Sequence, residues 1–362
     1  MSIKHQAEAL LAGIRAMSGE SFKIMEVCGS HTVAIAKSGV RELLPATVHL
    51  VSGPGCPVCV TDNSDIDRFL SLAQVPGVII ATFGDMIRVP GSKTSLQAVR
   101  AEGADIRVVY STLDALEISR QNPDKEVVFL GVGFETTIPT VAVSVEIAER
   151  ENLHNYSVLS MHKLVPPVLE LLVTDPELGL DGFINPGHVC SVLGTAPFEF
   201  MAGQYGMPSV VAGFEALDIL EAIWLLLRQR QEKRSKVEIQ YSRVVKPEGS
   251  LKAVEYINKY FDPTDAVWRG IGLVPQSGLR LKAEYSLFDA ARKFDLPKPK
   301  AVNTPGCLCG EILKGRRHPF DCRLFGKTCN PLHPVGPCMV SSEGSCAAYY
   351  RYSQRRGATD AG

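Results

Sequence analysis

Long apolar runs are missing from this chain of 362 residues. A membrane-spanning helix needs roughly 18 consecutive apolar residues, and no stretch of the sequence approaches that length. The N-terminal segment 1–19 has apolar residues at helical spacing, but polar and acidic residues interrupt them. This pattern predicts an amphipathic helix rather than a signal peptide. We therefore expect a cytoplasmic protein with no membrane partner.

Nucleotide-binding and nucleic-acid-binding motifs are also missing. The stretch GVGFETT, residues 131–137, has neither the G-x-G-x-x-G of dinucleotide-binding folds nor the G-K-[ST] of P-loops. No segment resembles a nucleic-acid-binding module. We therefore expect no nucleotide cofactor and no nucleic acid partner, and we expect Glu135 and Thr136 to cap a helix or to line a cleft.

The composition and the residue pattern that are present indicate a folded α/β protein. Apolar residues make up 45% of the chain and charged residues 21%, as in globular proteins, and the length implies two or three domains. Between about residues 22 and 240, short β-branched runs alternate with helical patterns, which predicts parallel sheets covered by helices. The predicted strands are FKIMEV, TVHLVSG, GVIIATFG, IRVVYS, EVVFLGVG, YSVLSM, DGFINPG and PSVVAGFE.

Two short echoes indicate that the α/β part consists of two related units. VGFETT at 132–137 resembles AGFEAL at 212–217, and SGPGCPVC at 52–59 resembles NPGHVCSV at 185–192. We predict a first α/β domain over 1–130, a second over 131–240, and a loop- and helix-rich C-terminal domain over 241–362. Because functional groups gather at the carboxyl ends of parallel strands, we expect these motifs to line a cleft.

The chain has ten cysteines. The cytosol keeps thiols reduced, so metal binding or redox chemistry is favoured over a disulfide framework. Four thiolates from one irregular segment suit tetrahedral zinc or a [4Fe–4S] cluster. The loose spacing of four tail cysteines differs from the tight C-x-x-C knuckles of zinc ribbons and favours an iron–sulfur cluster. These four are Cys322, Cys329, Cys338 and Cys346.

The tail contains two further thiols, Cys307 and Cys309, in a C-x-C pattern. They could replace two of the four cluster ligands, act as a redox pair beside the cluster, or be buried and inert. Six candidates compete for four positions, so the pattern leaves the ligand set open.

Three cysteines follow predicted strands. Cys56 and Cys59 form a C-x-x-C in a Gly- and Pro-rich turn, a spacing that permits a reversible disulfide or half of a zinc site. Cys28 is followed by Gly29, which permits close approach of the backbone, and by His31, which can act as a base or a hydrogen-bond donor. A buried core pair is the structural alternative for Cys28 and His31. Together, the three thiols favour a functional site, and a soft thiolate suits low-valent iron.

Four other residues receive no firm chemical role. We expect Cys190 to lie in the core, and single histidines such as His162 and His188 to be structural. Asp85 follows the third predicted strand and could line the same cleft.

The motifs CGSHT, GPGCPVC, TFGDM, GFETT and PGHV, with the tail CxCG…CxLFGKxC…GPCMVSSEGxCAAYY, resemble the hydrogenase maturation factor HypD family. They occur in family order over nearly the whole chain. The resemblance implies two related α/β domains and a C-terminal domain whose [4Fe–4S] cluster is held by Cys322, Cys329, Cys338 and Cys346. It also implies an assembly scaffold with redox activity, rather than a conventional enzyme, for the Fe(CN)2(CO) unit of [NiFe]-hydrogenases.

The same resemblance assigns the other motifs. It implies that Cys28 with its neighbour His31 corresponds to the iron-binding thiol site, and that Cys56 and Cys59 form a second thiol motif in the cleft. The implied partners are the small chaperone HypC and HypE, which delivers cyanide with HypF upstream.

By the same resemblance, Cys307 and Cys309 are the redox-active pair beside the cluster, similar to the thiol arrangement of ferredoxin–thioredoxin reductase. An alternative function is a cluster-driven thiol–disulfide oxidoreductase, although the chain lacks a thioredoxin-type W-C-x-x-C setting. A third interpretation is a zinc-stapled interaction protein without redox activity, against which the loose spacing and the surplus thiols count.

Overall fold

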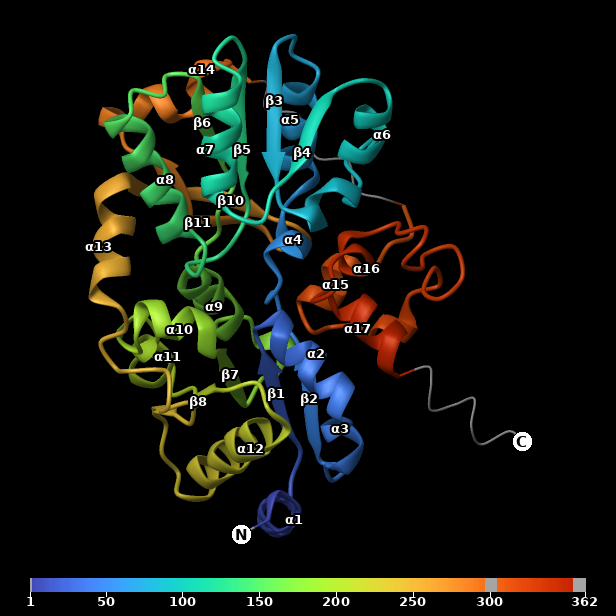
Figure 1. The fold of residues 1–362 in the computed structure, drawn as a ribbon. Coiled ribbons are helices and arrows are strands. Elements are labelled where there is room, and N and C mark those ends of the chain that lie inside the picture. Colours follow the sequence, from blue (N-terminus) through green and yellow to red (C-terminus); the bar gives the residue numbers. More distant parts are fainter. Residues whose placement is uncertain (1, 297–304, 354–362) are drawn as a thin grey trace.

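The chain folds into two parallel sheets with helices packed against them, and an antiparallel hairpin, in a computed structural model that describes residues 2–296 and 305–353 (Figure 1). The sheet orders are β2-β1-β7-β8-β9 and β4-β3-β5-β6. The strands of the first sheet are β1 (Phe22–Glu26), β2 (Val48–Ser52), β7 (Gly182–Pro186), β8 (Ser209–Ala212) and β9 (Val237–Ile239). Those of the second sheet are β3 (Val78–Thr82), β4 (Asp105–Val108), β5 (Glu126–Gly131) and β6 (Tyr156–Ser160). The expected α/β class is confirmed, and each predicted strand stretch contains a strand.

The two sheets do not follow the contiguous segments 1–130 and 131–240 expected from the sequence. β1 pairs with β7 between Ile24–Glu26 and Gly182–Ile184, so strands from both ends of the α/β part share one sheet. Strands β3 to β6 form the other sheet and are inserted between β2 and β7. Local residue patterns predict strands but not which strands pair, so the sequence could not reveal this insertion.

Helices bury one face of each sheet in a separate apolar core. On the first sheet, α1 and α12 pack together with α2 and α3. On the second sheet, α7 and α8 cover one face together with α13 and the hairpin. These helices are α1 (Ile3–Met17), α2 (Gly29–Ser38), α3 (Val40–Leu43), α7 (Thr112–Gln121), α8 (Ile138–Arg150), α12 (Ala216–Gln231) and α13 (Leu251–Tyr260).

A third core continues from the second sheet to the first and into the C-terminal unit. It contains Ile80 of β3, Phe183 of β7, and Trp268 at the end of the hairpin strand β10. The Trp268 indole donates a hydrogen bond of 2.8 Å to the Ser277 hydroxyl, so its buried N–H is satisfied. The other elements at this core are α4 (Pro57–Val60), α5 (Asn63–Ala73), α6 (Leu96–Ala101), α9 (Val165–Val173), α10 (Gly187–Leu193), α11 (Glu199–Gly203), α14 (Ala290–Lys293), β10 (Phe261–Trp268) and β11 (Gly272–Leu281).

The C-terminal unit, residues 305–353, consists of short helices joined by turns and lies to the right of both sheets in Figure 1. Its helices are α15 (Cys309–Leu313), α16 (Pro337–Val340) and α17 (Ser345–Tyr352). α16 contacts α4, and α17 contacts α2. The expected boundary at residue 241 is not a structural break, because α13 and the hairpin pack on the second sheet. Within the described ranges, no helix combines the length and apolarity needed to cross a membrane.

Candidate functional site

The carboxyl ends of the two sheets line a common cleft of about 520 Å³. The segments that follow β1, β2 and β7 form one side of the cleft, and those that follow β3, β4 and β5 form the other. The expectation that the motifs would meet at strand ends is therefore met for most of them. Lining residues from the motifs are Cys28, Gly55, Asp85, Gly133, Thr136 and His188. His188, which we expected to be structural, is thus one of the residues that line this cleft.

Cys28 is the N-cap residue of α2 and is held by neighbours on β1 and in the segment that follows β2. Its amide donates to Glu26 at 3.2 Å, and the Gly29 amide donates to the Gly55 carbonyl at 2.8 Å. A Cβ atom added to Gly55 would lie 2.2 Å from the Cys28 nitrogen, so only glycine permits this approach. Burial, together with the negative charge of Glu343, raises the pKa of the Cys28 thiol to about 12.

The His31 ring does not line the cleft. Its Nε2 lies 2.9 Å from the Gly213 carbonyl oxygen and 3.2 Å from that of Ala212, at the end of β8. Burial lowers the pKa of His31 to about 4, so the neutral ring donates through Nε2. Phe214 stacks against His31 at 4.7 Å and against His188 at 4.0 Å between ring centroids. His31 thus anchors α2 to the first sheet.

The loop 341–344, between α16 and α17, contacts both sides of the cleft. Ser341 donates at 3.3 Å to Asp85, which follows strand β3 of the second sheet. Ser30 on α2 donates to Glu343 at 2.7 Å. Sequence reasoning did not identify this loop as part of the site, although its sequence, SSEG, is part of the tail motif.

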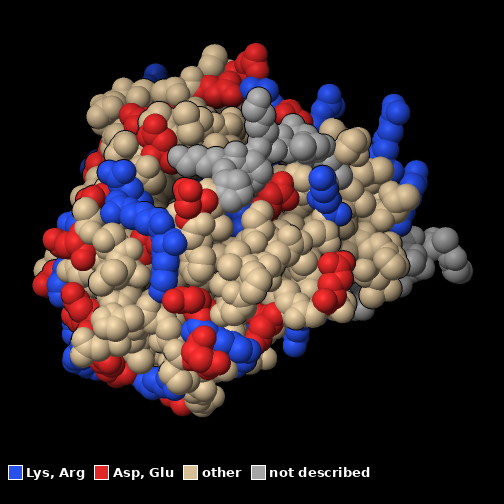
Figure 2. Space-filling view, turned by 90° about the horizontal axis from the view of Figure 1, so that it is seen from above, with Lys and Arg blue, Asp and Glu red and all other residues tan. Residues whose placement is uncertain are grey.

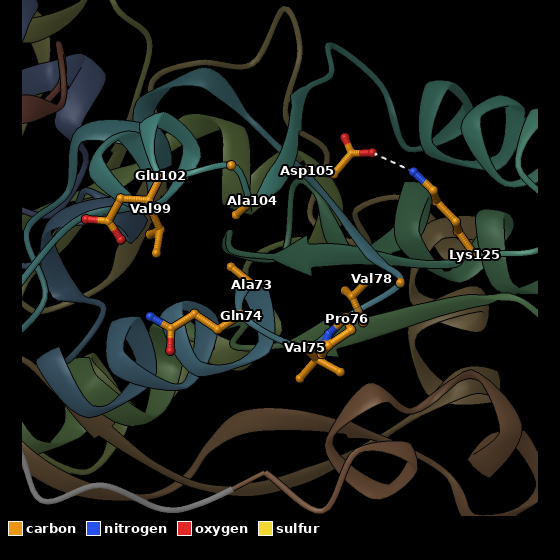
Figure 3. A pocket seen from close by; sticks show the side chains of 12 residues that line it. Ala73, Gln74, Val75, Pro76, Val78, Val99, Glu102, Ala104, Asp105 and Lys125 are labelled. Carbon is orange, nitrogen blue, oxygen red and sulfur yellow. Dashed lines mark hydrogen bonds and ion pairs between the residues drawn. The ribbon is translucent and has the colours of Figure 1, made fainter.

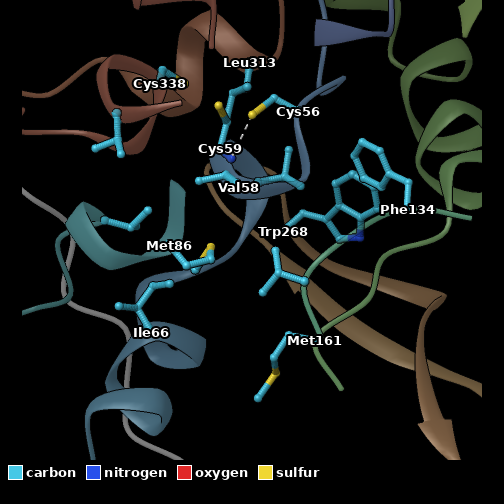
Figure 4. Close-up of a cluster of buried hydrophobic side chains, with 14 of the residues drawn as sticks. Cys56, Val58, Cys59, Ile66, Met86, Phe134, Met161, Trp268, Leu313 and Cys338 are labelled. Atoms are coloured by element: carbon cyan, nitrogen blue, oxygen red, sulfur yellow. Dashed lines mark hydrogen bonds between the residues drawn. The ribbon is translucent and has the colours of Figure 1, made fainter. Parts of the chain in front are cut away.

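Cys56 and Cys59 lie beneath the cleft rather than in it. Cys56 is the N-cap of α4 and accepts the Cys59 amide at 3.3 Å. The Cys59 thiol interacts with those of Cys56 and Cys338, and the Sγ atoms of Cys338 and Cys309 are 2.7 Å apart. Figure 4 shows Cys56, Cys59 and Cys338 close together in the buried core. Burial raises the pKa of Cys59 well above its usual value.

The other tail cysteines interact with one another and with Cys309. Cys307 interacts with Cys309, and its Sγ packs against Gly336, where an added Cβ would lie 2.8 Å away. Cys346 interacts electrostatically with several of the tail thiols, namely Cys307, Cys309, Cys322 and Cys329. Among the residues that the structure describes, no three His, Cys, Asp or Glu side chains form a group that could hold a metal ion. The structure therefore brings the six tail thiols into one region and sets Cys338 against Cys309.

The chain matches the family model described as "HypD: Hydrogenase formation hypA family" over residues 5–353. It is 46% identical over 363 residues to hydrogenase maturation factor HypD2 of Bradyrhizobium diazoefficiens, with 98% of this chain and 96% of that protein covered. The chain belongs to the HypD family. It is also 45% identical over 334 residues to hydrogenase maturation factor HypD of Escherichia coli, with coverages of 92% and 90%. HypD membership supports a role in hydrogenase maturation.

In this HypD-family chain, Glu135 of the GFETT motif lies below the cleft surface. It is 1% exposed and accepts the Val165 amide at 2.8 Å, at the start of α9. Its other carboxylate oxygen has no hydrogen-bond partner among the residues that the structure describes, and burial raises the pKa of Glu135 to about 7. Of the two expected roles, Glu135 therefore caps a helix, whereas Thr136 lines the cleft.

A second hollow, of about 440 Å³, lies at the amino end of the second sheet (Figure 3). Asp105 and Lys125 form an ion pair of 3.4 Å on its wall. Neither the cysteine motifs nor GFETT contribute to it, so it is separate from the candidate site.

Proposed function

We propose that the chain binds iron at Cys28 and retains it while the Fe(CN)2CO unit of [NiFe]-hydrogenases is assembled. One observation carries this proposal. Among the described residues, Cys28 is the cysteine that lines the cleft where both sheets end. Its thiolate is a soft ligand suited to low-spin iron(II), and the polar side chains of Asp85 and His188 line the same cleft.

We propose that a [4Fe–4S] cluster is held in the C-terminal unit by Cys307, Cys322, Cys329 and Cys346. Each thiol of such a set binds a separate iron, so the four thiols need not converge on one point. The sequence prediction named Cys338 in place of Cys307. The 2.7 Å distance between the Cys338 and Cys309 sulfurs favours this change of ligand, because two sulfurs this close can form a disulfide, which would remove both from the ligand set.

When bound, the cluster would supply one-electron transfer. The chain's own contribution is two buried thiol pairs in the same core, Cys309 with Cys338 and Cys56 with Cys59. Each pair can alternate between a dithiol and a disulfide. The interaction of Cys59 with Cys338 supports thiol–disulfide exchange between the two pairs. Cys56 is next to Gly55 in the chain and therefore lies near the Cys28 backbone.

We further propose HypC as the chaperone partner, and HypE with HypF upstream as the source of cyanide. Family membership supports these partners. The cleft is open to solvent at Tyr110, which is 93% exposed, so a partner's chain has access to the Cys28 side.

The buried thiol series also favours a second function, a cluster-driven thiol–disulfide oxidoreductase. Infrared spectroscopy with iron quantitation separates the two, on anaerobically purified chain co-expressed with its chaperone. Cyanide and carbonyl stretching bands, with iron beyond the four of one cluster, support the scaffold. A cluster without these bands, together with reduction of a generic disulfide substrate, would leave the oxidoreductase. Zinc in place of iron would contradict both.

A further inference from the structure

The segment between Cys322 and Cys329 forms a closed loop at the surface. The Phe325 amide donates to the Cys322 carbonyl at 3.0 Å, and the Cys329 amide donates to the Leu324 carbonyl at 2.9 Å. Cys322 and Cys329 are 8% and 7% exposed, whereas Arg323 and Lys327 between them are exposed. The two cysteines therefore keep a small exposed fraction and have exposed residues between them in the chain. We call residues 322–329 the cysteine loop.

The cations of the cysteine loop have no acidic partners among the described residues. Arg323 and Lys327 form no ion pair there, and neither does the exposed Arg317 nearby in the chain. By contrast, Arg316 is paired with Asp175. Figure 2 shows Lys and Arg side chains projecting along the right-hand side of its view. Asp321, next to Cys322, is the acidic residue of segment 317–329, so this segment has three Lys or Arg side chains against one carboxylate and a net positive charge.

Large apolar side chains flank this charge. Phe320, two residues before the cysteine loop, is 53% exposed, and Leu332, three residues after it, is 83% exposed. Exposed apolar groups beside unpaired cations are typical of a protein-binding surface, because charge steers the partner and apolar contact holds it. Small interfaces of this kind suit transient electron-transfer encounters.

We propose that the cysteine loop, with Phe320 and Leu332, is the docking surface for a small acidic protein that carries single electrons, of the flavodoxin or ferredoxin class. This inference rests on the proposed cluster, for which Cys322 and Cys329 are two of the ligands. The reduced partner transfers one electron to the chain's redox group, so the partner is oxidised and that group is reduced by one electron. Two such transfers and two protons convert a Cys309–Cys338 disulfide to two thiols.

A redox partner fits this surface better than other anionic partners. A nucleic acid or a lipid headgroup would be attracted by the cations alone, whereas neither explains why the cations surround two buried thiols. An acidic electron carrier uses both features, because its charge selects the surface, and the position of Cys322 and Cys329 near the surface shortens the distance that an electron must cross.

The test compares two variants that reverse the same amount of charge. Arg323→Glu with Lys327→Glu alters the cysteine loop, and Lys246→Glu with Lys252→Glu alters exposed lysines far from it. Binding of an acidic flavodoxin is measured calorimetrically on the intact anaerobic protein at low and high salt. We expect the loop variant and high salt each to weaken binding by about tenfold or more, and the control to stay within about twofold. Iron and sulfide content should be unchanged in both variants.

Equal affinity in the two variants, or no flavodoxin binding to the wild-type chain, would overturn the docking surface. Stopped-flow mixing with flavodoxin hydroquinone gives a second readout, and the loop variant should be reduced more slowly by about tenfold. The outcome also separates this inference from the proposed function. If the chain has no cluster but still binds flavodoxin in a way that depends on salt and on the cysteine loop, the docking surface stands and the proposed cluster is contradicted. If the chain has a full cluster but its binding does not depend on charge, the cluster stands and the docking surface is contradicted.

Discussion

Ser30 donates a hydrogen bond of 2.7 Å to Glu343, and this bond joins the helix that begins beside Cys28 to the loop that follows Cys338. On its other side the loop is packed tightly, since a Cβ atom added to Gly344 would lie 2.3 Å from the Cys338 carbonyl oxygen. A continuous set of contacts therefore connects the buried thiols of the C-terminal unit to the cleft.

Ser30→Ala should loosen this connection. A hydrogen bond to a charged carboxylate that is partly exposed contributes about 1 kcal/mol, and its loss should speed amide exchange in segments 29–33 and 341–345. Hydrogen exchange followed by mass spectrometry measures this. Ser38→Ala is the control, because within the described ranges the Ser38 hydroxyl bonds to carbonyls of its own helix. Equal exchange in the two variants would mean that the Ser30 contact does not hold the loop.

Gly55→Ala should displace Cys28 and destabilise the fold. The added Cβ meets the backbone of Cys28 and Val27 at 2.2–2.5 Å, and backbone cannot yield as a flexible side chain does. We expect a loss of about 1–3 kcal/mol and a lower thermal midpoint. Gly19→Ala serves as the control, because nothing lies within 4 Å of its added Cβ. A midpoint for Gly55→Ala as high as that of the control would contradict the close packing.

Glu135→Gln should change the pH dependence of stability. Burial raises the pKa of Glu135 to about 7, so the folded state binds this proton more tightly than the unfolded state. The resulting stabilisation is complete below about pH 4.5 and is lost as pH rises through about 7. Glutamine stays neutral at both pH values. The free energy of unfolding of the variant, relative to that of the wild type, should therefore rise by about 2 kcal/mol between pH 5 and pH 8. Denaturant unfolding at both pH values measures the gain, with the exposed Glu102→Gln as control. If the difference in unfolding free energy between the variant and the wild type is the same at both pH values, Glu135 is not a buried carboxyl group that is neutral in the folded state.

Cys307→Ser and Cys338→Ser distinguish the two candidate ligand sets. The proposed set predicts that Cys307→Ser loses most iron and acid-labile sulfide, because an iron–sulfur cluster lacking one thiolate is unstable. Cys338→Ser should retain both and instead lose the reversible pair with Cys309. Iron and sulfide assays, with thiol counting before and after mild oxidation, measure this. The reverse pattern would restore the set predicted from the sequence.

The sequence predicted local features well and spatial pairings poorly. β-branched runs such as the one ending at Ala212 predicted strands, because strand formation depends on nearby residues. The pairing of β1 with β7 depends on contacts some 160 residues apart, about which a periodic pattern is silent. For the same reason, spacing could group the tail cysteines but could not show that Cys338 lies against Cys309, or that the His31 ring turns toward β8.

We propose that Cys28 holds the iron while its ligands are added. The most direct measurement is infrared spectroscopy on anaerobic complexes of Cys28→Ala and of Cys190→Ala, a buried cysteine outside the cleft, each with iron quantitation. The account predicts that Cys28→Ala loses the cyanide and carbonyl bands but keeps its cluster iron, and that Cys190→Ala keeps both. Cyanide and carbonyl bands of wild-type intensity in Cys28→Ala would contradict it.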